Sequence, residues 1–472
     1  MRRQQQHVAT WLVALLMLSA CAGPRAAAPK AEAAEVVPGA GDLGSAQVSS
    51  EAAQRNKPAQ KGQSRAPTLR EERVIGELMD AAERVRELHF KQRVPVQVQD
   101  QERIAAYVET QIKDDELKRA AVVYTALGLL APDLDVRALL VRVMREQIVG
   151  YYDDDEKRLC VRDDIMHAFA DPDREDTGDL TEARMVLVHE LVHALQDQNL
   201  GLSQHIHDER DTDADNAFHA LVEGDATLAM IGYALEREQV PLHKLTGNPT
   251  QVRSFSDVVR RSPLAGTELE KAPAIIRVPL LSAYVDGLAF CASLHGAGGW
   301  AMVNQTHATP PTSTEQVLHP ERFAHGETAI HVHLPVLPAL AAAGYRELRE
   351  DTLGELELSV YLSQGSTEAE GRKLAAGWGG DRLRVYEVKG AGAAVVWLTL
   401  WDSDRYAEQA ADAAERVRNA CAPALRARSE VLHAGRAVLI LRDLPDAVRA
   451  QLKASFSAAG LADPARAPAA TH

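Results

Sequence analysis

The residues best suited to chemistry lie in the segment 185–198, where His189 and Glu190 are followed by His193. On a helix, residues four apart share one face, with about 5–6 Å between their Cβ atoms. Two imidazoles at that spacing can each reach one Zn²⁺ at about 2.0–2.1 Å. Glu190 is then placed to act as a general base on a metal-bound water rather than as a ligand. The pattern predicts a catalytic zinc site.

The residues that flank this motif predict a helix over about 179–198. Asp179-Leu180-Thr181-Glu182 has the spacing of a capping box, and Gly201 suits a helix C-terminus. The residues around the motif are apolar, so the helix would carry its histidines and glutamate into the interior. Each of those groups needs a partner there. Metal binding is therefore favoured over two core or solvated histidines.

A catalytic zinc needs a third protein ligand and an open position for water. The pattern HExxHxxGxxH is excluded, because the sequence has Gln196 and Asn199 where glycine and histidine are required. The next predicted helix, about 213–235, carries Glu223 beside Gly224. A glycine inside a helix costs about 1 kcal/mol relative to alanine, and a close approach of two helices would explain it. Glu223 is the predicted third ligand.

Other residues near Glu223 compete for this place or support it. His219 lies one turn earlier on the same helical face, and His205 and His207 lie in the preceding loop. The face also carries two candidates to orient the ligands. These are Asn216 and Thr227. Asp225 points away from this face and is expected to be a structural hydrogen-bonding residue.

The chain resembles the gluzincin class of metallopeptidases in HELVHALQDQ at 189–198 and LVEGDA at 221–226. The resemblance covers about 145–235. It implies a zincin-like fold with an active-site helix, a helix bearing the ligand glutamate, and a small sheet whose edge strand pairs with a substrate peptide. Residues 147–161, which have the pattern of a β-hairpin, are well placed to supply that edge. Many members carry an acidic residue where this chain has Thr227.

Peptide hydrolysis also needs a donor for the developing oxyanion besides the metal. Tyr284 lies before Gly287, and His319 lies at the end of the polar, proline-bounded run 310–320. Both are candidates for this donor. The alternatives, a packed tyrosine and a helix-capping histidine, remain open.

The N-terminus has the pattern of an export signal. Arg2 and Arg3 precede the apolar stretch 11–18, which is shorter than the roughly 20 residues that span a bilayer. Leu18-Ser19-Ala20-Cys21 resembles the lipobox of bacterial lipoproteins, so residues 1–20 are the predicted signal peptide and Cys21 the lipidation site. A plain secretory signal is the alternative.

Residues 21–66 follow as a predicted disordered tether, rich in Ala, Pro, Gly, Gln and Ser. Ala22 carries no acidic retention signal, which favours the periplasmic face of an outer membrane. The expected location is the cell envelope, with membrane contact through the N-terminal lipid.

Composition narrows the classes of partner. The net charge of −15 and the absence of a dominant basic stripe argue against nucleic acid. Cys160, Cys291 and Cys421 have no CxxC spacing, which disfavours a cysteine zinc site. A Cys160–Cys291 disulfide and small buried thiols are both open interpretations.

A length of 472 residues favours two or three domains. The fold class predicted is α+β: a mainly helical zincin-like metallopeptidase domain with a small sheet (67–329, including a helical lead-in), a small α+β domain (330–455), and a tail (456–472). In the small domain, strands are expected at 356–362, 383–388, 394–400 and 437–441, with a helix at 403–419.

The function expected is that of a lipid-anchored zinc peptidase acting on peptide or protein substrates. The alternatives are a catalytically silent, metal-stabilised scaffold and a binding lipoprotein. Retention of Glu190 argues against the scaffold, because a structural zinc site has no use for a base.

Overall fold

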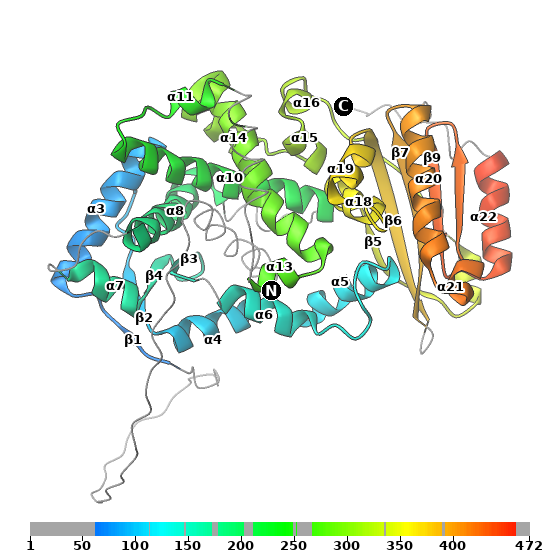
Figure 1. Cartoon of the computed structure of the whole chain (residues 1–472), viewed down its shortest axis with the longest axis horizontal. Coiled ribbons are helices and arrows are strands. Elements are labelled where there is room, and N and C mark those ends of the chain that lie inside the picture. The colour runs from blue at the N-terminus through cyan, green and yellow to red at the C-terminus, as the bar shows by residue number, and fades with distance from the viewer. Residues whose placement is uncertain are drawn as a thin grey trace, which may run out of the picture.

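The computed structural model describes residues 62–112, 114–145, 148–171, 178–202, 211–248, 252, 267–334, 337–388 and 392–458. A mainly helical part with a four-stranded sheet and a part built on a five-stranded sheet lie side by side along the long axis (Figure 1). The chain is therefore α+β, as predicted. The predicted signal peptide, Cys21, His205 and His207, and most of the tether and tail, lie outside the described residues.

The helical part contains α8 and α10, the two helices that carry the predicted metal site. Its longer helices are α3 (Leu69–Arg86), α4 (Gln101–Gln111), α5 (Asp114–Ala126), α6 (Val136–Arg145), α7 (Asp163–Ala170), α8 (Gly178–Leu200), α10 (Thr212–Arg237) and α14 (Ala274–Ala308). Its short helices are α11 (His243–Thr246), α13 (Glu268–Lys271), α15 (Thr314–Leu318) and α16 (Pro320–Ala324).

The four-stranded sheet has the order β1-β2-β4-β3, and β3 (Gly150–Asp153) is an edge strand. It pairs antiparallel with β4 (Arg158–Arg162), which confirms the predicted hairpin. β4 runs parallel to β2 (Val96–Gln99). β1 (Ser64–Arg65) also pairs with β2, so the predicted tether ends earlier than expected. Arg65 is held there by Glu71 of α3, 2.7 Å away.

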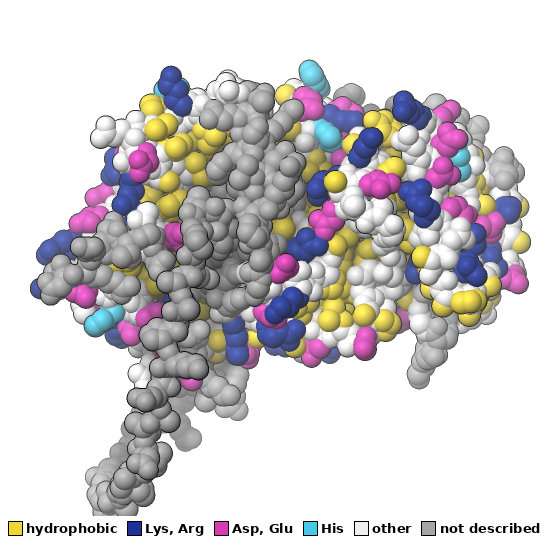
Figure 2. All heavy atoms as spheres, viewed as in Figure 1, with side chains coloured by type: hydrophobic (Ala, Val, Ile, Leu, Met, Phe, Trp, Pro, Cys, Tyr) yellow, Lys and Arg dark blue, Asp and Glu magenta, His cyan; other side chains and the backbone are white. Residues whose placement is uncertain are grey.

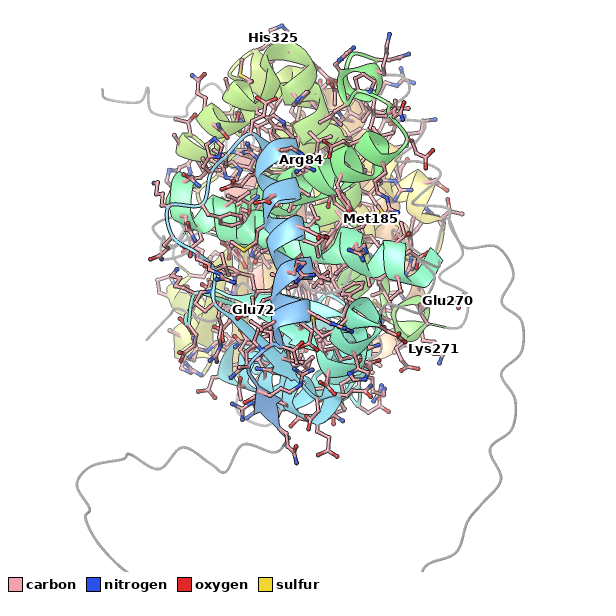
Figure 3. The ribbon with its side chains drawn as sticks, turned by 90° about the vertical axis from the view of Figure 1, so that its left-hand side faces the viewer. Glu72, Arg84, Met185, Glu270, Lys271 and His325 are labelled. Carbon is pink, nitrogen blue, oxygen red and sulfur yellow. The ribbon has the colours of Figure 1, made fainter. Side chains whose placement is uncertain are left out.

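The predicted active-site helix is α8, and it is buried along its middle. Every residue from Val186 to Gln196 is buried, so this segment lacks the alternation of an apolar and a polar face that usually indicates a helix in a sequence. The helix ends at Leu200, and Gly201 follows with φ +66°, which suits glycine. Figure 3 shows α3, marked by Glu72 and Arg84, lying across α8, on which Met185 is labelled.

Helices α10 and α14 cross at two facing glycines. A Cβ atom on Gly224 would collide with the backbone of Gly287, and a Cβ on Gly287 would collide with the carbonyl oxygen of Ala220. The close helix approach that Gly224 predicted is therefore present, and its partner is α14. This crossing brings α14 within reach of the residues that surround Glu223.

Helix α14 is long and apolar enough to cross a membrane by length and hydropathy. Within the molecule, 67% of its most apolar window is buried, and it packs against α10. Non-helical backbone at Gly298 and Gly299 interrupts it. These features are those of a core helix of this fold.

The five-stranded sheet is antiparallel, with the order β5-β6-β7-β9-β8. Three predicted strands and the predicted helix are confirmed. The elements are β5 (Arg346–Asp351), β6 (Trp378–Val388), β7 (Gly392–Trp401), β8 (Glu430–Ala434), β9 (Ala437–Arg442), α17 (Pro338–Ala342), α18 (Gly354–Leu362), α19 (Glu368–Ala375), α20 (Asp404–Ala420), α21 (Pro423–Ala427) and α22 (Asp446–Ala458).

The prediction of a strand at 356–362 is wrong, because this segment is helix α18. Its alternating apolar and polar residues have the period of a strand. All nine residues of α18 are buried, however, and its polar side chains find partners inside the protein. Glu355 bonds His319 and Glu357 bonds Tyr124. A helix buried on every side has no apolar stripe for periodicity to detect.

The two parts meet at a buried polar seam around the N-terminus of α10. Asp351 accepts hydrogen bonds from the backbone N–H and the hydroxyl of Thr212, at 2.9 and 2.7 Å. Asp213 accepts from the N–H of Thr314 at 2.8 Å, and a side chain at Gly354, where φ is +74°, would collide with its carboxylate. The first turn of α10, the helix that carries Glu223, is therefore held by hydrogen bonds and close packing against the C-terminal part.

Glu357 gives this seam an expected pH dependence. Its Oε1 accepts from the hydroxyl of Tyr124 at 2.8 Å and from Asn216 at 3.3 Å, whereas Oε2 has no partner among the described residues. Burial, with a smaller contribution from Asp351, raises its pKa to about 8. The folded chain therefore binds more protons than the unfolded chain between about pH 4.5 and 8, and stability falls as pH rises through this window.

Glu357→Gln should remove this loss, because glutamine is neutral and its oxygen can accept the same bonds. We expect nearly equal free energies of unfolding at pH 5 and a gain for the variant of about 4 kcal/mol at pH 8.5, since about three pKa units separate pH 5 from the folded pKa of about 8 and each unit corresponds to about 1.4 kcal/mol. Urea unfolding at both pH values measures it. Parallel pH profiles for the two proteins would contradict the assignment.

The three described cysteines are free thiols, so the Cys160–Cys291 disulfide is not formed. Cys160 and Cys291 are buried in different hydrophobic clusters, which explains why they do not meet. Both act as small core residues, the other interpretation that the sequence left open.

Candidate metal centre

Three candidate ligand atoms converge between α8 and α10. The Nε2 atoms of His189 and His193 are 3.0 Å apart, and Oε2 of Glu223 lies 3.2 Å from the first and 3.6 Å from the second. All three side chains are buried, and their ligand atoms lie within 4.8 Å of one another. The predicted ligand set is thus brought together in space.

The geometry and chemistry of this group fit a zinc ion. Bonds of about 2.0–2.1 Å at tetrahedral angles separate two ligand atoms by about 3.3 Å, close to the separations found here. Oε1 of Glu223 is buried and has no hydrogen-bond partner among the described residues, which leaves it available to a cation. Two imidazoles and one carboxylate also form a known type of catalytic zinc site.

The charge state of Glu223 suits a ligand. Burial opposes its ionisation, but the charge on His193 and the hydrogen bond with His189 outweigh burial and hold the pKa of Glu223 well below its usual range. Burial lowers the pKa of His189. The carboxylate is therefore anionic at neutral pH, as metal binding requires.

Glu190 contacts the edge strand beside the three converging groups. Its Oε2 accepts the backbone N–H of Tyr152 in β3 at 3.1 Å. Burial raises its pKa to about 8, with a further contribution from the charge of Glu223. A carboxyl group with this pKa can take up and release a proton near neutral pH.

The hairpin that supplies this edge strand is fastened to α8. The hydroxyl of Tyr152 donates to Asp197 at 2.7 Å, and Lys157, in the turn between β3 and β4, pairs with the same carboxylate at 2.6 Å. Asp197 lies four residues after His193. The edge strand and the ligand-bearing helix are therefore held in a fixed relation.

The two predicted oxyanion donors have different positions. The ring of Tyr284, fully buried in α14, stacks on the imidazole of His189 with 5.9 Å between centroids. His319 instead hydrogen-bonds both carboxylate oxygens of Glu355 in α18, at 3.0 Å each, on the side of the seam. It makes no side-chain cap at α16. Only Tyr284 lies at the ligand group.

The sequence predicts roles for four further polar residues of α10, as a ligand, as partners of the ligands or as a structural hydrogen-bonding residue. His219, the competing ligand, is not one of the three groups that converge in the described part of the chain. Asn216 bonds Glu357 at the seam, and the hydroxyl of Thr227 has no partner among the described residues, so neither orients a ligand. Asp225 is a hydrogen-bonding residue, as predicted, and it contacts Gln196, which accepts from His193.

Gln196 belongs to the site although the sequence motif does not predict it, since in the sequence it marks only a departure from another zinc pattern. One signal was available. Gln196 follows His193 by three residues, on the same helical face, at the end of an otherwise apolar run. A buried amide at that spacing needs polar partners.

Comparison with known proteins bears on the C-terminal part. Residues 342–455 match a family described as a domain of unknown function (DUF8575). No curated protein and no solved structure matches the chain. The matched region contains the five-stranded sheet and lies outside the elements that carry the candidate ligands.

Proposed function

We propose that this chain is a zinc-dependent peptidase of the gluzincin type, with a zincin-like metal domain. The observation that carries the proposal is the convergence of His189, His193 and Glu223, with Glu190 between this group and a sheet edge. Zn²⁺ at this position would lower the pKa of a bound water and polarise a carbonyl group. A site that served folding alone would not require Glu190.

The roles of the protein side chains follow from their positions. Glu190 takes a proton from the attacking water at a carboxylate oxygen and later delivers it to the leaving amine. Tyr284, packed on His189, is the proposed donor to the oxyanion. His319 is left out of this mechanism because Glu355 holds it at the seam.

The proposed substrate is an extended peptide that pairs with β3. The backbone N–H of Arg162 donates to the carbonyl oxygen of Val149, and Tyr151 pairs with β4 two residues later. Because backbone groups alternate in direction along an antiparallel strand, the N–H of Tyr152 points to the opposite side, toward α8. A peptide strand added on that side would lie beside Glu190. Surface charge is mixed in sign on the face shown in Figure 2, with Lys and Arg interspersed among Asp and Glu.

The N-terminal residues extend the proposal to a location. The lipobox-like Leu18-Ser19-Ala20-Cys21 supports anchoring of the enzyme in a bacterial cell envelope by lipidation of Cys21. Radiolabelled fatty acid should enter the wild-type chain and not a Cys21→Ser variant if this proposal holds.

The first test is metal removal from the chain without its predicted signal peptide. We expect one zinc ion per chain and cleavage of casein or of a peptide library. Chelation should abolish cleavage and added Zn²⁺ should restore it, because the proposed reaction needs the metal ion that the three converging groups would hold. A well-folded chain without zinc would contradict the metal site. Zinc without cleavage of any substrate would favour the scaffold or binding lipoprotein.

A further inference from the structure

A fully buried carboxylate, Asp225, lies two residues after Glu223 and collects four hydrogen bonds. Arg86 donates from Nε at 2.6 Å and from Nη2 at 3.1 Å. His307 contacts it through Nε2 at 2.9 Å, and the amide of Gln196 donates at 3.0 Å. Burying a charge is costly unless it is paired and hydrogen-bonded, and this one is fully supplied with donors.

These partners come from separate helices. Arg86 ends α3, Gln196 belongs to α8 and His307 lies near the end of α14, whereas Asp225 belongs to α10. Arg86 is itself fixed, because its guanidinium lies 4.3 Å from the ring centroid of Trp300. One carboxylate therefore joins the four helices that surround the ligand group.

The hydrogen bonds of Gln196 determine which way its amide faces. Its Nε2 donates to two acceptors, the carbonyl oxygen of Val222 at 2.9 Å and Asp225 at 3.0 Å. Its Oε1 must then be the atom 2.9 Å from Nδ1 of His193. An amide oxygen only accepts, so Nδ1 of His193 carries the proton. In the neutral ring, Nε2 is left with its lone pair directed toward His189 and Glu223.

We infer that Gln196 and Asp225 are positioning residues that hold His193 in the tautomer and orientation a metal ion requires, an inference that rests on the proposed function. The amide of glutamine combines the acceptor that His193 needs with the two donors that Val222 and Asp225 need. Glutamate would face Asp225 with a second negative charge, and methionine would fill the space without hydrogen bonds. Outer partners of this kind raise ligand basicity and metal affinity.

The arrangement also accounts for Thr227, which stands where many gluzincins have an acidic residue. Here the acidic residue is Asp225, and it acts on His193 through Gln196 instead of contacting a ligand directly. The hydroxyl of Thr227 contributes no hydrogen bond among the described residues.

The test is the Zn²⁺ affinity of the full mature chain, measured by chelator competition. Gln196→Met should weaken binding by about 10–100-fold, the usual effect of losing an outer partner. Trp401→Phe is the matched control, because it removes a different buried hydrogen bond, from Trp401 to Thr399 at 2.9 Å in the C-terminal sheet. It should lower the melting temperature of the metal-free protein and leave Zn²⁺ affinity unchanged.

A second measurement needs no variant. In zinc-loaded wild-type protein labelled with ¹⁵N-histidine, the Nδ1–H of His193 should give a slowly exchanging resonance, assigned by its loss in His193→Gln. Absence of that proton, or wild-type affinity in Gln196→Met, would overturn the inference. Wild-type protein without zinc would overturn both the inference and the proposed function. Zinc with the expected affinity loss but without peptide cleavage would uphold the inference and reject the peptidase.

Discussion

Glu190→Gln should reduce kcat/KM for peptide cleavage by about 10²–10⁴-fold, the usual contribution of a general base. Glutamine has nearly the same shape, and its oxygen can still accept the N–H of Tyr152. It cannot take a proton from water. Zinc content should remain at the wild-type value, because Glu190 is not one of the converging ligand groups.

The loss of activity in Glu190→Gln should not come from misfolding of the variant. Burial raises the pKa of Glu190 to about 8 in the chain without metal, so the neutral amide of glutamine should be tolerated at this buried position. Glu355→Gln is the matched control: it changes another buried glutamate, which pairs with His319 at the seam, and should retain activity. Full cleavage by Glu190→Gln would remove the assigned base. Loss of cleavage in the control would return His319 to consideration.

Glu223→Gln should lower Zn²⁺ affinity by more than the 10–100-fold expected for an outer partner, because it removes a charged ligand. Competition with a chelator at pH 7 measures this change. The metal-free protein should also lose stability at neutral pH. His193 and His189 depress the pKa of Glu223, so its carboxylate stabilises the fold above the unfolded pKa of about 4.3, and this contribution is lost as pH falls toward about 2.

His219→Gln is the control that separates the two ligand candidates, because it changes a group one turn away on the same helix. We expect it to bind zinc as the wild type does. Retained affinity in Glu223→Gln, together with loss in His219→Gln, would assign the third ligand to His219. Loss in both variants would indicate that α10 as a whole had shifted, which the melting temperatures of the metal-free proteins would reveal.

The placement of the C-terminal part affects how the alternatives are tested. Val123 and Leu127, which lie within the predicted helical lead-in, pack in the same cluster as the C-terminal sheet, and Arg442 donates to the carbonyl of Ala126 at 2.7 Å. Asp351 also binds the start of α10. Residues 342–455 thus share their core with the helical part. A binding function is better tested by surface substitutions in the whole chain than by isolating this segment.

The sequence by itself predicted the three groups that converge in the structure, His189, His193 and Glu223, because helical spacing and a glycine beside a glutamate are visible in the sequence. Helical spacing places His189 and His193 on one face, and Gly224 signalled the close helix crossing beside Glu223. Alternation and turn residues likewise predicted the hairpin that became β3 and β4. These features need only the regular periods of helix and strand.

Only the tertiary structure decided which distant residues support the site. Arg86, Gln196, Asp225 and His307 come from four helices, and no local period relates them. For the same reason the residue pattern of α18 predicts a strand although the segment is a helix, and spacing alone does not separate His319 from Tyr284. Buried polar groups choose their partners by where whole elements pack, so their roles appear only when burial and the direction of every donor are known.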